Sequence, residues 1–114
     1  MLIFLNGQRN LIIFPKETLE ELNKPKYFQI SSDGKGILIR YSKRKQLAEA
    51  CTVEYPLKAN SYGFHLRDEK VADALRKRYG WDDYLYAIDV IPFLGAFAID
   101  PAYAQKTNTR NAGL

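Results

Sequence analysis

Few side chains in this sequence of 114 residues could carry out acid–base or covalent chemistry. The single histidine, His65, alternates with Phe64 and Leu66, so in a strand it would point away from their face, and we expect it at a surface or an edge. Asp82 and Asp83 are adjacent carboxylates that follow a helical pattern, and we expect them to form a turn rather than a metal site. The sequence has no glycine-rich loop ending in Lys-Ser or Lys-Thr. We therefore predict a protein that is not an enzyme and that uses no cofactor and no metal.

The cysteine content points to a reducing compartment. Cys51 is the only cysteine, which excludes an intramolecular disulfide and a thiol-rich zinc site. We expect Cys51 to be a small buried apolar residue rather than a reactive thiol. The apolar run Leu2–Leu5 is too short for a signal peptide or a membrane span. A cytoplasmic protein with no membrane partner is expected.

The positive charge is concentrated in the first half of the chain. The net charge is +4 and the pI is near 9.2. Residues 1–58 hold ten Lys and Arg against six Asp and Glu, whereas residues 59–114 hold seven of each. Such an excess is typical of a surface that meets phosphate, although a protein that is merely basic is an open alternative.

Two hairpins and a short helix are predicted in the first half. Leu2–Leu5 and Leu11–Phe14 are apolar runs separated by an Asn-Gly turn signal. A helix of about two turns follows Pro15 and should dock on these strands, because it is too short to be stable alone. The runs Tyr27–Ile30 and Ile37–Tyr41 flank an Asp-Gly step and indicate the second hairpin.

The second half shows the order strand, helix, strand, strand. The helix begins at Asp68 and Glu69, has an apolar stripe and a basic last turn, and ends at Gly80. Strands are predicted before it at 62–66 and after it at 84–91 and 93–99, and a further strand is possible from Cys51 to Tyr55.

These elements predict an α+β fold with two lobes. The expected organisation is a hairpin and short-helix lobe at 1–41, a connection at 42–60, a β-α-β-β lobe at 61–104 and a disordered tail at 105–114.

The stretch from Asn10 to Arg40 resembles the looped-hinge, swapped-hairpin AbrB/SpoVT family of DNA-binding domains. The resemblance lies in the Phe14-Pro15-Lys16 step, the short helix ending in Leu, the Lys24-Pro25 hinge and the Asp-Gly hairpin that closes on Ile and Arg. With the first strand it covers about forty residues, roughly a third of the chain. It implies a homodimer whose hairpins interleave, with cations on one side contacting DNA.

The resemblance also implies a set of DNA-binding residues. Arg9, Lys16, Lys24 and Lys26 would neutralise phosphates. Gln8 and Asn10 beside Arg9 are candidates for reading base edges, with a solvated turn as the alternative. A second candidate patch, for which a solvated strand exit is the alternative, consists of Arg40, Lys43, Arg44 and Lys45.

Three functions follow from these features. The first is a dimeric DNA-binding protein, either a transcriptional regulator or an antitoxin. The alternative, from another class, is a small phage or mobile-element protein that binds and inhibits a host protein such as a CRISPR nuclease, as an anti-CRISPR protein does; it is favoured by small size, missing catalytic groups and many aromatic residues. The third is an RNA-binding module that stacks bases on strand aromatics, namely Tyr62, Phe64, Tyr84, Tyr86 and Phe97.

Overall fold

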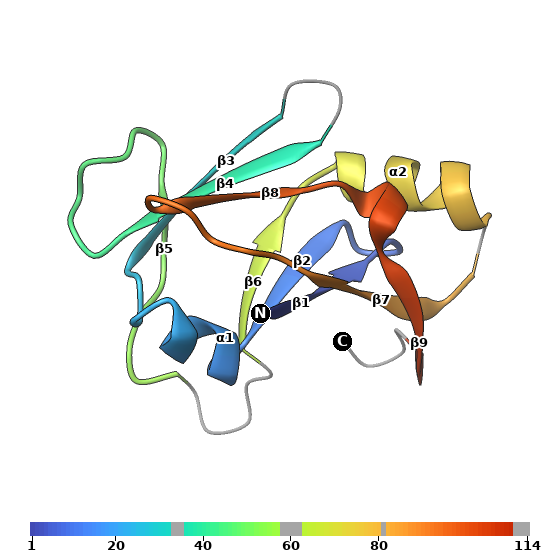
Figure 1. Ribbon diagram of the computed structural model, residues 1–114, viewed down its shortest axis with the longest axis horizontal. Helices are drawn as coiled ribbons and strands as arrows, with labels where there is room; N and C mark the ends of the chain where they lie inside the picture. Colours follow the sequence, from blue (N-terminus) through green and yellow to red (C-terminus); the bar gives the residue numbers. More distant parts are fainter. Residues whose placement is uncertain (33–35, 58–62, 81, 111–114) are drawn as a thin grey trace.

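The computed structural model describes residues 1–32, 36–57, 63–80 and 82–110, and shows the expected α+β fold, built on two antiparallel sheets (Figure 1). The five-stranded sheet contains, in spatial order, β6 (Gly63–Arg67), β2 (Leu11–Pro15), β1 (Leu2–Asn6), β7 (Tyr84–Asp89) and β9 (Gln105–Arg110). The four-stranded sheet contains β5 (Cys51–Thr52), β3 (Tyr27–Ser32), β4 (Ile37–Ser42) and β8 (Ala96–Ile99). The helices are α1 (Lys16–Glu21), α2 (Lys70–Tyr79) and the 3-10 turn η1 (Pro101–Tyr103).

The core lies between the facing sides of the two sheets. Phe14 of β2 is fully buried, and its ring centroid lies 4.8 Å from that of Phe28 on β3 and 6.0 Å from that of Phe97 on β8. Phe64 of β6 stacks on Phe28 at 5.5 Å. Aromatic pairs at these separations stabilise a core beyond the burial of their area, so this cluster joins the two sheets.

The first hairpin and the short helix are confirmed. Strands β1 and β2 pair around a turn in which the side-chain oxygen of Asn6 accepts hydrogen bonds from the backbone N–H groups of Gln8 and Arg9, both at 3.1 Å. Helix α1 begins directly after Pro15, where a missing N–H costs nothing. Its side chain Leu19 is buried, as the docking of a marginal helix requires.

The second hairpin and the long helix are also confirmed. Strands β3 and β4 pair from Tyr27 opposite Ser42 to Ser32 opposite Ile37, while the expected Asp-Gly turn lies outside the described residues. Helix α2 buries Val71, with its neighbours on the same stripe, against the sheet and ends at Gly80. The expected strand from Cys51 to Tyr55 is only two residues long, and Val53 directly after it is buried in the core.

The predicted division into lobes 1–41 and 61–104 is wrong. Strand β1 pairs with β7, β2 pairs with β6 and β4 pairs with β8, so both sheets combine strands from both halves of the chain. Consecutive strands β7 and β8 lie in different sheets. The open backbone edges of each hairpin need partners, and the second half of the chain supplies them. The connection expected at 42–60 contains β5, which pairs with β3.

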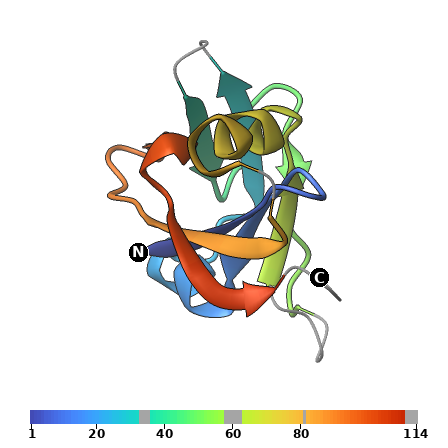
Figure 2. The same ribbon diagram turned by 90° about the vertical axis from the view of Figure 1, so that its right-hand side faces the viewer.

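The tail expected to be disordered contains strand β9 instead. Gln105–Arg110 pairs with β7, as the orange and red strands of Figure 2 show, and residues 111–114 lie outside the described part. The hydroxyl of Thr107 donates to the carbonyl oxygen of Leu85 at 2.9 Å, and Arg110 contacts both carboxylate oxygens of Asp83 at 2.5–2.6 Å. Backbone pairing and ion pairs hold this polar segment, so apolar periodicity could not reveal it.

Two further findings concern Cys51 and the length of the helices. Cys51, expected to be buried, is exposed, because it lies on the short edge strand β5. Across the described ranges, no helix is long and apolar enough to cross a membrane.

Candidate nucleic-acid interface

The residues that could do chemistry lie in or next to the five-stranded sheet, His65 on β6 and the two aspartates before β7. His65 is exposed on the edge strand β6, as expected. Partial burial of its ring lowers the pKa of His65 below the ordinary value, and the charge of Arg9 lowers it further. Among the described residues, no group of three His, Cys, Asp or Glu side chains could hold a metal ion.

Asp82 and Asp83 anchor the C-terminal strand. Asp82 accepts hydrogen bonds from the hydroxyl of Tyr86 at 2.5 Å and from the backbone of Tyr84 at 3.1 Å, and its carboxylate lies 3.4 Å from the ammonium of Lys106. Burial pushes the pKa of Asp82 upward, but these hydrogen bonds and the Lys106 charge outweigh it, so the pKa lies below the ordinary value. Both carboxylates are thus used in holding β7 and β9 together.

The expected DNA-binding residues separate into two groups. Gln8, Arg9 and Asn10 lie in the β1–β2 turn, whereas Lys16 follows the other end of β2. Five strand residues separate the two sites by roughly 15–20 Å. Asn10 holds helix α2, because its side-chain oxygen accepts from the N–H of Ala72 at 3.3 Å and its carbonyl oxygen accepts from that of Asp68 at 2.8 Å. The side-chain oxygen of Asn10 therefore has a structural role in holding α2.

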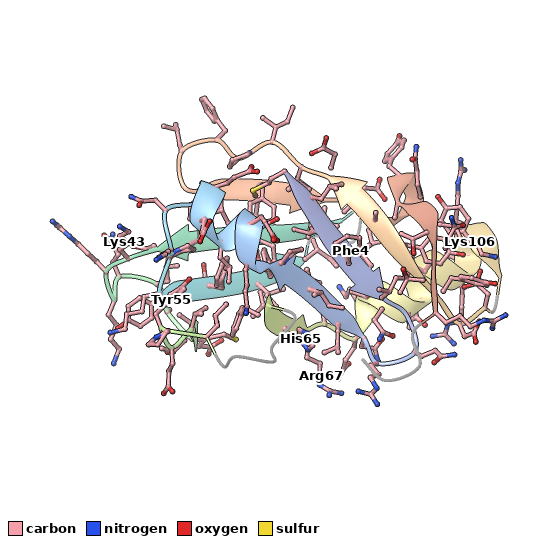
Figure 3. The ribbon with its side chains drawn as sticks, turned by 90° about the horizontal axis from the view of Figure 1, so that it is seen from below. Phe4, Lys43, Tyr55, His65, Arg67 and Lys106 are labelled. Carbon is pink, nitrogen blue, oxygen red and sulfur yellow. The ribbon has the colours of Figure 1, made fainter. Side chains whose placement is uncertain are left out.

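The larger group of cations gathers at one end of the four-stranded sheet. We call it the basic end and define it as Lys24, Lys26, Arg40, Lys43, Arg44 and Lys45, all of which are exposed. Figure 3 shows Lys43 at this end, far from Lys106 at the other. Within the described ranges no carboxylate lies within ion-pair distance of these six cations. None of these six cations is therefore held in an ion pair by the described residues.

Hydrogen bonds bring these cations together from three segments, namely the residues before β3, strand β4 and the loop after β4. The N–H of Lys26 donates to the carbonyl oxygen of Ser42 at 3.0 Å, which places the segment before β3 beside the end of β4. The Ser42 hydroxyl accepts from the N–H of Arg44 and from the side-chain amide of Gln46, both at 3.0 Å. The side chain of Gln29 on β3 donates to the carbonyl oxygen of Ala48 at 2.9 Å. The loop after β4 is thus fixed against the sheet by hydrogen bonds.

Lys16 lies beside this group on another surface. Together with Lys24 it lines a groove of about 440 Å³ between α1 and the segment after β5. Tyr55 also lines this groove, and its hydroxyl donates to the carbonyl oxygen of Pro25 at 2.8 Å. Of the four phosphate contacts implied by the family resemblance, Lys16, Lys24 and Lys26 are therefore neighbours, and Arg9 is not.

The outer face of the four-stranded sheet lies next to the basic end and carries Arg40. Arg40 lies opposite Gln29 on one side and Ala96 on the other, and all three point away from the core because their neighbours Phe28, Ile39 and Phe97 point into it. Beside Arg40 this face carries the polar Gln29 and the small Ala96, and Leu38 lies two residues away on β4. Exposed cations at the end of this face can contact the phosphates of a polyanion.

The connection between β7 and β8 lies next to the basic end (Figure 1). Its residues were not identified from the sequence as a candidate binding surface. Three of its side chains are strongly exposed: Ile91 at 87%, Phe93 at 74% and Leu94 at 88%. We call these three residues the apolar turn. The N–H of Tyr41 on β4 donates to the carbonyl oxygen of Gly95 at 2.9 Å, so this turn is tied to the strand that carries Arg40.

The apolar turn is a tight two-residue hairpin. The N–H of Phe93 donates to the carbonyl oxygen of Ala96 at 2.8 Å, and the N–H of Ala96 donates back to Phe93 at 3.2 Å. Leu94 and Gly95 both have positive φ, 52° and 78°. We predicted a strand from Phe93 to Ile99, but it begins only at Ala96. The Leu94-Gly95 step is the only sequence signal for this turn. It is a weak signal, because Asn or Asp normally precedes glycine in turns of this kind.

The aromatic residues proposed for RNA stacking are not available for it. Phe64, Tyr86 and Phe97 pack in the core, and Tyr62 lies outside the described residues. The ring of Tyr84 lies under the Lys106 ammonium, 4.3 Å from its centroid, and under a second cation. Packing in the core makes three of the five rings unavailable for stacking on bases, which removes the main support for the RNA-binding hypothesis.

Comparison with known proteins adds no homologue to this description: no family model, curated protein or solved structure matches the chain. The resemblance to the swapped-hairpin family stays a prediction.

Proposed function

We propose that this protein is a non-enzymatic, cytoplasmic DNA-binding protein that contacts the phosphate backbone of a duplex through its basic end. The observation that carries the proposal is the cluster of six exposed cations, none of which has a carboxylate within ion-pair distance among the described residues. Because each cation that contacts a phosphate releases condensed counterions, such a cluster favours binding to any duplex. A transcriptional regulator is the biological role that fits best, with an antitoxin as the related alternative.

Dimerisation is a separate prediction. The family resemblance implies a homodimer with interleaved hairpins. In this fold, strands of the same chain already pair with the outer edges of β1, β2 and β4. Interleaving is therefore not needed to complete the sheets, and a dimer would join two finished protomers. Light scattering on the purified protein measures its mass directly.

The DNA-binding proposal is tested by fluorescence anisotropy of a labelled random duplex at several salt concentrations. If all six cations contact phosphates, the logarithm of the association constant should fall against the logarithm of salt with a slope of about −5. Replacing Lys43, Arg44 and Lys45 together with alanine should reduce the steepness by about 3. At about 0.1 M salt this loop variant should bind up to about 500-fold more weakly.

A charge-matched control separates a defined site from general basicity. Replacing Arg67, Lys77 and Arg78 with alanine removes the same charge from exposed positions on β6 and α2. This control variant should keep the slope of the wild type. Equal losses in both triple variants, or no binding by the wild type at low salt, would refute the proposal.

A second function is favoured by the apolar turn. Exposed aromatic and aliphatic side chains on a rigid turn are typical anchors of protein–protein interfaces. A wild-type protein with no affinity for DNA at low salt would therefore favour the alternative class, an inhibitor that binds a host protein such as a CRISPR nuclease.

A further inference from the structure

The apolar turn is unusual for its exposure. Within the described ranges, six large hydrophobic side chains are exposed, and three of them lie in the four residues from Ile91 to Leu94. Single exposed hydrophobic residues need no explanation, but a contiguous group marks an interaction site.

The backbone of the turn strengthens this interpretation. Leu94 has a φ of 52°, in the left-handed region that disfavours residues with a branched side chain and favours Asn or Gly. The leucine therefore contributes neither backbone stability nor burial to the fold. Residues held in such conformations concentrate at functional sites, where the surrounding structure fixes them.

The turn is also rigid. Its reciprocal hydrogen bonds between Phe93 and Ala96, and the bond from Tyr41 to Gly95, hold its backbone in place beside β4. A pre-formed apolar projection loses little conformational entropy when it inserts into a ligand.

The surroundings of the turn indicate the ligand. Arg40 is the ladder partner of Ala96, at the base of the turn, and Lys43–Lys45 follow the same strand three residues later. A ligand for this end of the molecule must offer apolar surface close to anionic groups. A base-pair step of duplex DNA does so, because its base faces lie between two phosphate backbones.

We propose that the apolar turn is a wedge that inserts Phe93 and Leu94 between base pairs from the minor groove and bends the duplex away from itself. The wedge rests on the proposed DNA-binding function and assigns a second part of its site. Wedges of Phe, Leu and Ile bend DNA by roughly 20–90° and unstack the step at which they insert. The basic end then contacts the backbone on the sides of the inserted turn.

The bend is measured by resonance energy transfer between dyes at the two ends of a short duplex, on addition of the purified full-length protein. A second duplex containing 2-aminopurine reports unstacking as a rise in fluorescence. The wild type should raise both signals under conditions where anisotropy shows the duplex to be saturated.

The turn variant carries Phe93→Ser and Leu94→Asn, and Tyr103→Ser, which removes an equally exposed aromatic side chain from η1, is the matched control. The turn variant should keep the salt slope of the wild type, bind about tenfold more weakly and lose both signals, because its cations remain while the wedge is gone. The Tyr103→Ser variant should behave as the wild type.

The outcomes distinguish the two proposals. Binding by the wild type with no bend, or an equal bend by the turn variant, overturns the wedge and leaves DNA binding intact. Failure of the wild type to bind DNA at low salt overturns both.

Discussion

Replacing Leu94 with Asn should make the protein more stable. Leu94 is held at a φ of 52°, where a leucine is disfavoured by roughly 1–2 kcal/mol relative to the right-handed region. Asparagine is the residue that tight hairpin turns prefer before glycine, and it tolerates this conformation. Because the leucine side chain is 88% exposed, almost no buried apolar surface is lost by the change. The hydrogen bonds of the turn are made by the backbone and should remain.

The expected gain is about 1 kcal/mol in the free energy of unfolding. In urea this gain raises the midpoint by roughly 0.5 M with an unchanged slope, and in a thermal scan it raises Tm by about 4 °C. Both are measured on purified protein without any ligand. The prediction thus tests the geometry of the turn independently of DNA binding.

Leu94→Ala is the matched control. Alanine also removes the exposed leucine side chain, but it keeps the left-handed penalty of a residue with a Cβ atom. Its stability should therefore stay within about 0.5 kcal/mol of the wild type. An unchanged or lowered midpoint for Leu94→Asn, or an equal gain for both variants, would show that the turn conformation does not determine the stability.

Two other predictions concern the five-stranded sheet. Gly63→Ala should destabilise the fold by about 3 kcal/mol or more, because a Cβ at its φ of 146° would lie 1.9 Å from the carbonyl oxygen of Phe14; a urea midpoint close to that of the wild type would contradict this packing. For Asp82, burial raises the pKa but the hydrogen bond from Tyr86 and its other partners lower it further, so the folded pKa lies below the ordinary value of 3.8. The stability gained from the charged carboxylate is therefore complete above about pH 5 and is lost as the pH falls through the folded pKa. The stability advantage of the wild type over Asp82→Asn should then shrink on going from about pH 6 to about pH 3 in urea titrations, and an advantage that grows at low pH would reverse the sign of the argument.

The local elements were determined by the sequence, because their signals lie within a few residues. The hairpin of β1 and β2, the hairpin of β3 and β4, and helix α2 were predicted from turn residues, periodicity and Gly80. The exposed position of His65 also followed from alternation with its neighbours. Each of these features depends on contacts that the local chain makes with itself.

The partners of the strands could not be read from the sequence. Whether β1 meets β7 or remains an open edge depends on which pairing buries the most apolar surface in the whole chain, and periodicity carries no information about that choice. The order of Gln105–Arg110 has the same origin, because an existing edge and ion pairs across it hold a segment with no apolar pattern. The exposure of Cys51 follows from its place on an edge strand, which only the complete sheet defines.

The residues of the candidate site could be predicted from the sequence, but their grouping in space could not. Composition and charge indicated that the first half of the chain carries unbalanced cations, and the sequence identified each of them. Only the tertiary structure decided that Lys26, Arg40 and Lys43 meet at one end while Arg9 lies elsewhere, because that grouping depends on the pairing of β3 with β4. The apolar turn joined them only when β8 paired with β4 and the chain between the sheets had to reverse at Leu94. Residue types are local properties of a sequence, whereas a binding surface is made by contacts between distant segments.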